Sequence, residues 1–545
     1  MTAKFNRHFW LLVLLLTVVG LLLCYRLDYR SLWGSEGRWA EIAREMIATG
    51  DYFVPTINGA AYAVQKPLLS YWMICLSAKV SGEISEWDAR LPTAIFGFFS
   101  VFFLYLMGRK LFNPRIGLLA AAIMGSGFLF VFWSKTANSD IPTLALFLLT
   151  LYLFLCCEQK QNKTWLFLFY ALMAISSNIK GLLGFALPAV VLIPYSWRTR
   201  RWDWLLNKTT LPALGLSFFL YFIPALLSSL QGGSLTPLWN ILKENFLRYT
   251  AAVDHTDPFY IYFILIFPLF APWSFFLPKA LIHSWSSRKN EKVFFALSLF
   301  LNVFLFFLLS ESRRSYYLLP TLPGASLLVA ILFQDWALAQ RKQNRFLLIS
   351  MALFSFLIFT LGISLLFFDV ALTKLPPLKW NELFGFILVV LSPLIFILTL
   401  KQKKILALSL TFACIYFINI ITWAKGFPYL EKFRGNKKFL QEVKTLIEAP
   451  HVQQPTLYLY GLKGADTFYL EKKVPEIHSQ EELIRLFNSK EESWFLVSER
   501  KIKTAESQFK REKKILAEQP FIEEAYSFME LGARYQLLSN QTETE

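Results

Sequence analysis

The sequence has few charged residues and few cysteines for its length. Charged side chains make up 17% of the 545 residues, whereas apolar side chains make up 55% and aromatic ones 17%. The five cysteines lie in or beside apolar runs and have neither the spacing of a disulfide framework nor that of a metal site. We therefore expect them to be small apolar packing residues. The sequence also lacks internal repeats and low-complexity segments.

Long apolar runs dominate the sequence instead. Several reach about 20 residues, the length that a helix needs to cross a bilayer core of roughly 30 Å. The chain is therefore predicted to be a polytopic α-helical membrane protein. Its first run, Phe9 to Leu23, follows Lys4 and Arg7 as in a secretory signal, but no small-residue cleavage site comes after it. We expect an uncleaved signal anchor.

Thirteen apolar segments are candidate membrane spans. If the N-terminus is cytoplasmic and the spans alternate, the seven cytoplasmic segments together carry a charge of +17, which equals the net charge of the whole chain. This matches the positive-inside rule, so the basic balance indicates topology and argues against nucleic-acid binding. Two short spans, 164–178 and 181–197, could form a single irregular hairpin. The candidates are 9–24, 89–107, 116–134, 141–157, 164–178, 181–197, 209–230, 258–278, 293–310, 316–333, 346–367, 382–400 and 405–423.

The composition changes abruptly after the last span. Residues 424–545 are rich in charges of both signs in equal number, and we expect them to form a soluble C-terminal α/β domain on the outer side. We see no catalytic constellation in this domain. The patterns predict helices at 437–448, 480–487 and 506–516, and strands at 456–460, 467–470, 494–497 and 534–538.

The first outer loop, residues 25–88, contains the most informative polar stretch. Ser35 is a plausible N-cap that places Glu36 in the first turn of a helix, near the positive end of its dipole. A second apolar helix is expected to begin at Pro67. Two helices in the interface plane would place Glu36 and Lys66 near the mouth of a cavity between spans. An apolar stripe is formed by Trp39, Ile42, Ala43, Met46 and Ile47. The alternative is a surface helix pair with solvated charges, among them Arg38, Glu41 and Glu45.

Other chemically capable residues lie in connections on the same outer side. Asp140 opens the fourth span and Lys180 lies between the fifth and the sixth. A group of cations on one side of the membrane suits a phosphate, because guanidinium and ammonium groups donate charge-assisted hydrogen bonds. Each cation taken alone could equally extend toward lipid headgroups. The remaining candidates are Arg248, Arg313, Arg314 and Tyr317.

Several motifs in one order resemble a known family. The chain resembles the bacterial GT-C-fold glycosyltransferases that use lipid-phosphate sugars, in particular the 4-amino-4-deoxy-L-arabinose lipid A transferases, which are akin to protein O-mannosyltransferases. The resemblance covers roughly residues 9–335 by motif, and chain length and the C-terminal domain extend it. It rests on SEGRWAEIAREM, GDYFVP, ING, QKPLLSYW, ARLPTA, Asp140, KGLLGFALP and RRSYYLLPTLP.

The resemblance implies an inverting sugar transfer from a polyprenyl (undecaprenyl) monophosphate to an acceptor on the periplasmic face. A carboxylate would accept the proton of the acceptor hydroxyl, and cations would stabilise the departing phosphate. The implied catalytic residues are Glu36 or, less favoured, Asp140, with Ser35 and Arg38 supporting the loop. The implied phosphate-binding residues are Lys66, Lys180, Arg248, Arg313, Arg314 and Tyr317.

The sequence departs from the family pattern at two positions. Ser35 stands where the family usually has an aspartate, and a serine hydroxyl is no proton acceptor at neutral pH. Gln65 stands where many relatives have a glutamate, which weakens any argument for a divalent metal. We therefore expect Glu36 to carry the catalytic role. No cofactor is indicated with certainty, and a divalent metal stays open as an alternative that Ser35 and Gln65 weaken.

The family resemblance implies a multi-pass protein of the bacterial inner membrane, expected to be a monomer, with a cytoplasmic N-terminus and a periplasmic C-terminal domain. Residues 1–423 would form the transmembrane glycosyltransferase domain. The acceptor, whether lipid A, another envelope glycan or a protein, stays open. A flippase or transporter for lipid-linked sugars is disfavoured because the spans are almost free of charge. An inactive relative that only binds polyprenyl phosphate is a further alternative, since the usual aspartate is missing.

Overall fold

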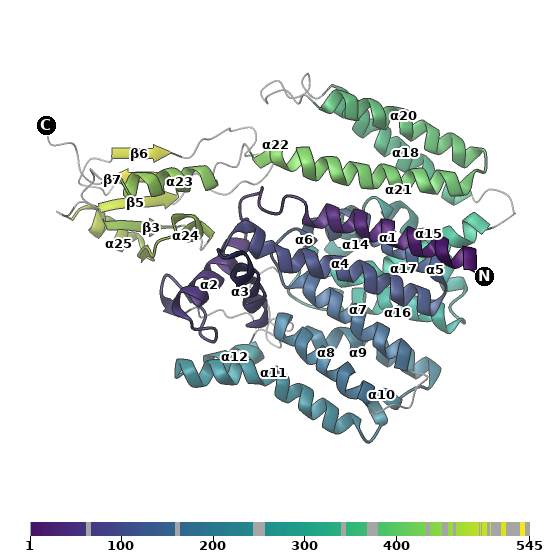
Figure 1. Ribbon diagram of the computed structural model, residues 1–545, viewed down its shortest axis with the longest axis horizontal. Helices are drawn as coiled ribbons and strands as arrows, with labels where there is room; N and C mark the ends of the chain where they lie inside the picture. Colours follow the sequence, from purple (N-terminus) through teal and green to yellow (C-terminus); the bar gives the residue numbers. More distant parts are fainter. Residues whose placement is uncertain are drawn as a thin grey trace. The chain divides into compact units, whose positions relative to one another are not determined.

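The computed structural model divides into two compact units (Figure 1). The first unit comprises Met1–Tyr25, Thr93–Ser229 and Ser234–Ile421, and the second comprises Arg26–Pro92, Leu230–Gly233 and Thr422–Glu545. The structure describes residues 2–61, 67–157, 164–243, 257–338, 345–367, 380–431, 436–449, 456–461, 465–489, 491, 493–498, 502, 514–518 and 535–539.

The first unit is built from helices. Their apolar side chains are continuous around most of each helix, as is typical of helices that lie in lipid or in a helical core. The helices are α1 (Thr2–Cys24), α4 (Glu86–Leu111, in this unit from Thr93 on), α5 (Pro114–Ser126), α6 (Phe128–Ser134), α7 (Asp140–Cys157), α8 (Thr164–Lys180), α9 (Leu183–Thr199), α10 (Asp203–Leu206), α11 (Thr210–Gly232, in this unit up to Ser229), α12 (Thr236–Leu242), α14 (Ile261–Leu269), η2 (Trp273–Phe276), α15 (Leu277–Ser286), α16 (Glu291–Leu308), η3 (Ser315–Thr321), α17 (Leu322–Leu338), α18 (Arg345–Leu366), α20 (Asn381–Leu400) and α21 (Lys404–Ile421).

The described residues contain nine helices that are long and apolar enough to cross a membrane, or up to eleven if each of two bent pairs is one span. The chain is thus a multi-pass membrane protein, as the sequence predicted. The bent pairs correct two of the expected straight spans. Within 116–134, α5 and α6 meet at Gly127 with a bend of 68°. Within 258–278, the helices on either side of residues 270–272 are bent by 116°. Pro268 and Pro272 explain the second break, because proline donates no backbone hydrogen bond.

Glycines let several helix pairs of the first unit approach closely. A Cβ added at Gly324 of α17 would lie 2.5 Å from the backbone nitrogen of Phe300 in α16. A Cβ at Gly362 of α18 would lie 2.8 Å from the carbonyl oxygen of Gly385 in α20. Small residues at helix crossings are the usual way in which membrane helices pack, because lipid tails provide no hydrophobic driving force between helices.

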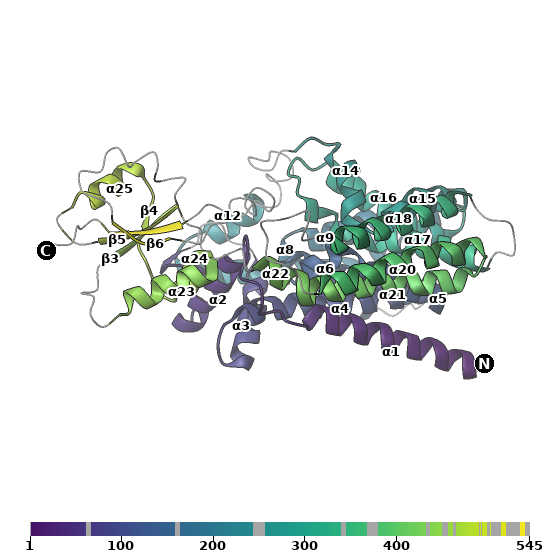
Figure 2. The ribbon, with the colours of Figure 1, turned by 90° about the horizontal axis from the view of Figure 1, so that it is seen from above.

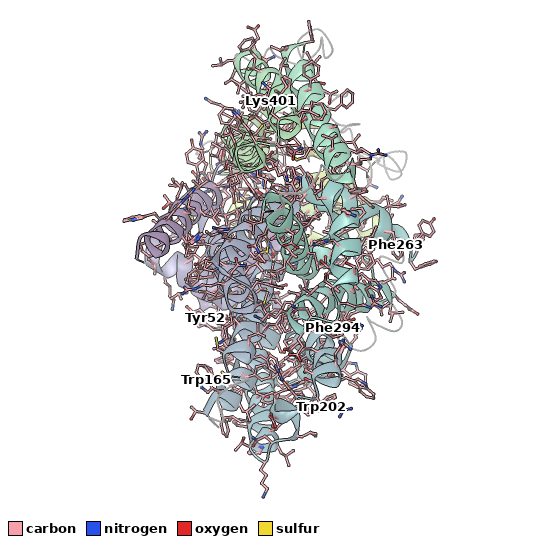
Figure 3. All side chains as sticks on the ribbon, turned by 90° about the vertical axis from the view of Figure 1, so that its right-hand side faces the viewer. Tyr52, Trp165, Trp202, Phe263, Phe294 and Lys401 are labelled. Carbon is pink, nitrogen blue, oxygen red and sulfur yellow. The ribbon has the colours of Figure 1, made fainter. Side chains whose placement is uncertain are left out.

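Many large apolar side chains point away from the helices of the first unit. Phe263 of α14 is an example that Figure 3 shows projecting outward, with about half of its surface exposed. On α18, Ile349, Phe356 and Leu357 are likewise exposed. Apolar side chains exposed along helices of this length are expected where the surface faces acyl chains.

The second unit begins with the two predicted helices of the first outer loop. They are α2 (Glu36–Thr49) and α3 (Leu69–Ser81), and each is followed by a glycine in the left-handed conformation, Gly50 and Gly82. The predicted apolar stripe of α2 packs against α3 in a core formed by Trp39, Ile42, Ala43, Met46, Leu68, Tyr71, Ile74 and Cys75. Between the helices, β1 (Thr56–Ile57) and β2 (Ala60–Ala61) pair through a tight turn at Asn58 and Gly59, both with positive φ.

The C-terminal part of the second unit contains a five-stranded sheet in the order β4-β3-β5-β7-β6. Its strands are β3 (Thr456–Tyr460), β4 (Glu476–Ile477), β5 (Ser493–Ser498), β6 (Lys514–Glu518) and β7 (Tyr535–Ser539). β3 pairs in parallel with β4 and β5, whereas β7 is antiparallel to β5 and β6. Figure 2 shows helices on both faces of the sheet, α25 (Gln480–Phe487) on one and α23 (Asn436–Ile447) on the other. The unit also contains η4 (Thr422–Gly426) and α22 (Phe427–Glu431).

Most of the elements expected after residue 424 are present, with two errors. Residues 467–470 form part of a helix, α24 (Ala465–Leu470), and not a strand, because Phe468, Tyr469 and Leu470 are all buried and do not alternate. Residues 514–516 begin β6 and so are no helix, while 506–513 lie outside the described residues. The short strand β4 was not expected, since two residues give no periodicity.

Candidate functional site

Glu36 is the first residue of α2, as the sequence predicted. Ser35 occupies the N-cap position, but its side chain makes no cap hydrogen bond and is exposed. The carboxylate of Glu36 instead binds the segment before the helix, since its Oε2 accepts a 3.0 Å hydrogen bond from the backbone nitrogen of Trp33. Arg38, two residues after Glu36, is half-buried. The helix start is thus stabilised from inside by a buried carboxylate.

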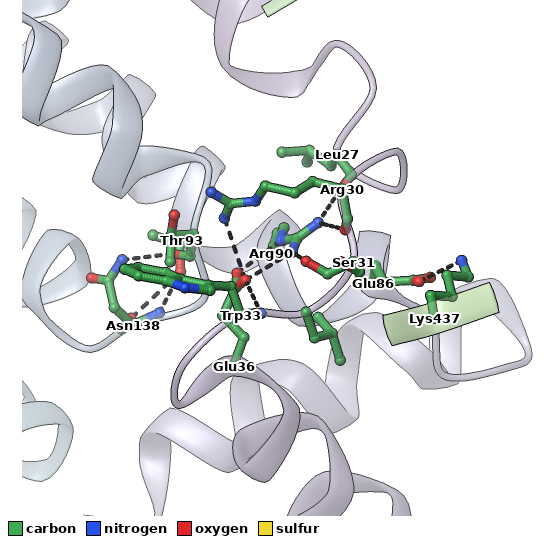
Figure 4. A network of polar contacts seen from close by, with 12 residues as sticks. Leu27, Arg30, Ser31, Trp33, Glu36, Glu86, Arg90, Thr93, Asn138 and Lys437 are labelled. Atoms are coloured by element: carbon green, nitrogen blue, oxygen red, sulfur yellow. Dashed lines mark hydrogen bonds and ion pairs between the residues drawn. The ribbon is translucent and has the colours of Figure 1, made fainter. Parts of the chain in front are cut away.

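Two arginines bind the buried carboxylate of Glu36 (Figure 4). Arg90 donates from Nε to Oε1 and from Nη2 to Oε2, both at 2.8 Å, which is the two-pronged geometry that a guanidinium offers a carboxylate. Arg30 donates from Nη2 to Oε2 at 3.3 Å. Glu36 is fully buried, so these are desolvated ion pairs.

Arg90 also organises the chain segment that precedes Glu36. Its Nη1 donates to the carbonyl oxygens of Leu27 at 2.7 Å and Arg30 at 2.6 Å, and its Nη2 donates to that of Ser31 at 3.0 Å. With the two bonds to Glu36, all five N–H groups of the guanidinium are used. Arg90 belongs to the motif ARLPTA, but the sequence pattern did not indicate its role. The available signal was an arginine at the start of an apolar run.

The other acidic residues of α2 correct one sequence interpretation. The alternative of a surface helix pair with solvated charges is wrong, because Glu41 and Glu45 are buried. Glu45 accepts hydrogen bonds from the hydroxyl of Thr56 and from the backbone nitrogen of Gly59, at 3.1 Å in the latter case. Glu41 pairs with Arg44 at 2.6 Å, yet burial raises the pKa of the Glu41 carboxyl.

The other candidate catalytic carboxylate, Asp140, belongs to the first unit and lies at the start of α7. The side chain of Asn138 fixes this start, since its Oδ1 accepts from the backbone nitrogens of Asp140 at 2.8 Å and Ile141 at 3.0 Å. Asp140 is buried to more than nine-tenths. Its Oδ1 accepts a hydrogen bond from the ammonium group of Lys180, the last residue of α8. Among the described residues, Oδ2 of Asp140 receives no hydrogen bond.

Aromatic rings surround Lys180 in the first unit. Its ammonium nitrogen lies 5.0 Å from the ring centre of Tyr317 and 5.8 Å from that of Tyr316. Tyr316 in turn lies 4.6 Å from the ring of Trp133 and 5.8 Å from the guanidinium carbon of Arg314. The fold therefore brings together four of the residues that the sequence singled out: Asp140, Lys180, Arg314 and Tyr317.

Arg313 differs from its neighbour Arg314. Its guanidinium donates to the carbonyl oxygens of Asp257 at 2.6 Å and Glu311 at 3.4 Å. Arg314 is held through its backbone, which exchanges hydrogen bonds with the hydroxyl of Tyr262. The predicted phosphate ligands Lys66 and Arg248, and also Gln65, lie outside the described residues.

The fold matches that of a solved ArnT structure. The crystal structure of ArnT from Cupriavidus metallidurans bound to undecaprenyl phosphate superimposes with a TM-score of 0.74 over 97% of this chain and 98% of that one, at 18% sequence identity. The chain therefore has the polytopic GT-C membrane fold, as predicted.

Sequence comparisons agree with this fold. Residues 65–227 match the model of the dolichyl-phosphate-mannose-protein mannosyltransferase family. An undecaprenyl phosphate-alpha-4-amino-4-deoxy-L-arabinose arabinosyl transferase of Pseudomonas aeruginosa (strain UCBPP-PA14) is 31% identical over 327 residues, and an uncharacterised protein of Aquifex aeolicus is 27% identical over 446 residues. The match to the arabinosyl transferase covers 58% of this chain and 58% of that protein. The match to the Aquifex protein covers 80% of this chain and 82% of that protein. The resemblance of this chain to the aminoarabinose lipid A transferases is confirmed.

Proposed function

We propose that this protein transfers a sugar from an undecaprenyl monophosphate donor to lipid A or another envelope glycan. The observation that carries the proposal is the fold match, over nearly the whole chain, to a transferase bound to undecaprenyl phosphate. The names of the curated relatives support aminoarabinose as the sugar class. Transfer to a protein acceptor is the second candidate, which the family match over residues 65–227 favours.

The reaction needs one proton acceptor and a cationic phosphate site. The oxygen of the acceptor hydroxyl attacks the anomeric carbon, the bond from that carbon to the phosphate oxygen breaks, and undecaprenyl phosphate leaves with the bonding electrons. Configuration at the anomeric carbon is inverted. The acceptor proton passes to a carboxylate, and the charge that develops on the phosphate is stabilised by nearby cations.

Asp140 suits the proton acceptor better than Glu36. Donors from Arg90, Arg30 and the backbone of Trp33 already engage both oxygens of Glu36, so taking up a proton there would disrupt buried ion pairs. Asp140 uses Oδ1 for Lys180 and has Oδ2 available among the described residues. We therefore assign Asp140 as the base and Glu36 as the residue that fixes the first outer loop, the reverse of the order that the sequence favoured.

In the first unit, Arg314, Tyr317 and Lys180 would bind the donor phosphate, with Arg313 contributing positive charge. Lys66 and Arg248 remain the further phosphate ligands that the family resemblance implies. We propose no resident metal, since Ser35 and Gln65 replace the carboxylates that could bind one. The protein would act as a monomer.

Removal of Lys66 is expected to weaken donor binding. Lys66→Ala should raise the donor KM at least tenfold or abolish turnover, because the donor phosphate loses a charge-assisted contact worth about 1.5–3 kcal/mol. Steady-state kinetics with purified donor measure the donor KM. Lys79→Ala is the matched control, since Lys79 is exposed on α3, and it should leave the KM unchanged. An unchanged KM in Lys66→Ala would remove Lys66 from the phosphate site.

Loss of Lys180 is expected to lower turnover more than donor binding. Lys180→Met leaves Asp140 without its cation and removes positive charge beside Tyr317, so turnover should fall roughly 100-fold. Lys208→Met, an exposed lysine of the same unit, is the control. Wild-type turnover in Lys180→Met would show that the Asp140–Lys180 pair has only a structural role.

We also propose a membrane topology with thirteen spans. The described residues contain nine spans and two bent pairs. With α8 and α9, which have 17 residues each, the number of spans would be thirteen. Together with the basic cytoplasmic segments, this supports an inner-membrane protein with a cytoplasmic N-terminus. Residues 1–423 would form the transmembrane domain and residues 424–545 a periplasmic α/β domain, which the five-stranded sheet supports.

Mass spectrometry of envelope lipids tests the proposed acceptor. Lipid A from cells with and without the gene should differ by the mass of one pentosamine, and the gene supplied in trans should restore the difference. Identical lipid A accompanied by a glycan change on secreted proteins would favour the protein-acceptor alternative. No change in either would contradict the proposed function.

A further inference from the structure

The segment before Glu36 is held by side chains that come from distant parts of the second unit. Residues 27–33 form neither helix nor strand. Arg90 binds the carbonyl oxygens of Leu27, Arg30 and Ser31. Three backbone nitrogens of the same stretch donate hydrogen bonds to side-chain oxygens. Two of the accepting side chains lie in the C-terminal part of the chain, after residue 422.

Glu431 and Tyr469 are these two acceptors. Oε1 of Glu431 accepts from the backbone nitrogen of Ser31 at 2.9 Å and also from its hydroxyl. The hydroxyl of Tyr469 accepts from the backbone nitrogen of Leu32 at 2.6 Å. Since Glu36 itself binds the nitrogen of Trp33, three consecutive amides are held by three side chains.

Tyr469 links the loop to the helix that carries Arg90. Its hydroxyl donates to Oε1 of Glu86 at 3.2 Å, and the same oxygen accepts from Lys437 of α23. Glu86 and Arg90 lie one turn apart on α4, so they project from the same face of the helix. Tyr469 is buried, and burial together with the negative charge of Glu86 raises the pKa of its hydroxyl, which remains protonated as a donor. A phenol has one donor and one strong acceptor position, and both are used here.

We propose that Tyr469 is a positioning residue for residues 27–36 of the first outer loop, and that the C-terminal α/β part of the chain is therefore needed for turnover and not only for anchoring or acceptor recruitment. Tyr469 fixes Leu32 against α4, and Glu431 fixes Ser31 beside it. The geometry of Trp33 and Glu36 then follows, because only a few residues separate them from these two contacts. This inference rests on the proposed function, since it assumes that the loop takes part in sugar transfer.

Tyr469→Phe tests the proposal in the full-length protein in detergent. Phenylalanine keeps the ring but can neither accept from Leu32 nor donate to Glu86. We expect turnover at saturating donor to fall at least tenfold while the donor KM stays within twofold, and the amide of Leu32 to exchange with solvent deuterium at least tenfold faster. Tyr458→Phe is the matched control. Tyr458 belongs to β3, where its ring stacks on Phe495, and this variant should match the wild type in both measurements.

Glu431→Ala is a second variant that loosens Ser31 from the other side. It should produce the same combination of faster exchange over residues 27–33, lower turnover and unchanged donor KM, including in the case that Tyr469→Phe does not fold. Full turnover in a folded Tyr469→Phe or Glu431→Ala would overturn the proposal, as would unchanged exchange at Leu32. If the wild type itself fails to turn over, the proposed function is wrong, while the exchange measurement still decides whether Tyr469 fixes the loop.

Discussion

Arg90→Met is expected to be the most destabilising single substitution in the second unit. It removes the two-pronged ion pair from the buried carboxylate of Glu36, and it removes the donors to three backbone carbonyl groups. Breaking a buried ion pair by removing one partner costs about 3–5 kcal/mol. Thermal unfolding of the purified protein in detergent should show a clear fall in melting temperature and little active protein.

Arg201→Met is the matched control for this change. Arg201 pairs with Glu291 at 3.2 Å, but both side chains are about half exposed, and a pair of this kind contributes at most about 1 kcal/mol. The melting temperature of Arg90→Lys should lie between those of Arg90→Met and Arg201→Met, because lysine keeps the charge but cannot supply the five fixed donors of a guanidinium. A melting temperature of Arg90→Met equal to that of Arg201→Met would contradict the assigned role of Arg90.

Asp140→Asn is expected to cause the largest loss of turnover. An amide cannot accept the proton of the acceptor hydroxyl, and loss of a general base lowers the rate by roughly 10²–10⁴-fold. Donor binding should change little. Steady-state kinetics and donor binding, measured on the same preparation, separate the two effects. Asn is nearly the same size and can still accept a hydrogen bond from Lys180, which is partly exposed, so the melting temperature should fall less than in Glu36→Gln, where two buried guanidinium groups lose their counter-charge.

Glu36→Gln provides the contrast to Asp140→Asn. It removes the negative charge that faces Arg90 and Arg30, so we expect a lower melting temperature and a smaller loss of turnover per folded molecule. The opposite result would reverse the assignment. If Glu36→Gln melts like the wild type but is inactive, while Asp140→Asn stays active, then Glu36 is the base, as the sequence alone favoured.

The sequence identified the parts of the fold that depend on local pattern. Apolar run length predicted the multi-pass architecture, helical spacing predicted α2 and its stripe from Trp39 to Ile47, and a proline before an apolar segment predicted α3. Local residue pattern predicted the wrong structure where contacts between distant parts of the chain determine it. Residues 467–470 read as a strand by composition, but they form a helix whose three consecutive apolar residues are buried. The bends at Gly127 and residues 270–272 were missed because hydropathy is continuous across them.

The candidate site was predictable in its residue types but not in its contacts. Motif order pointed to Glu36, Asp140, Lys180 and Arg314, and the structure places the last three near one another in the first unit. The partner of Glu36 could not be inferred, because Arg90 is 54 positions away and lies in what reads as a membrane span. The same holds for Tyr469, which is 437 positions from Leu32. Pairings over such separations depend on tertiary packing, which local periodicity does not encode.

Turnover by the purified full-length protein tests the proposed reaction most directly. The protein is incubated with undecaprenyl phosphate-linked 4-amino-4-deoxy-L-arabinose and lipid A, and the products are measured by mass spectrometry. We predict lipid A that is heavier by one aminoarabinose residue together with an equal amount of released undecaprenyl phosphate, both lost in Asp140→Asn. Unmodified lipid A and intact donor, in a preparation that binds the donor and melts cooperatively, would contradict the proposed function.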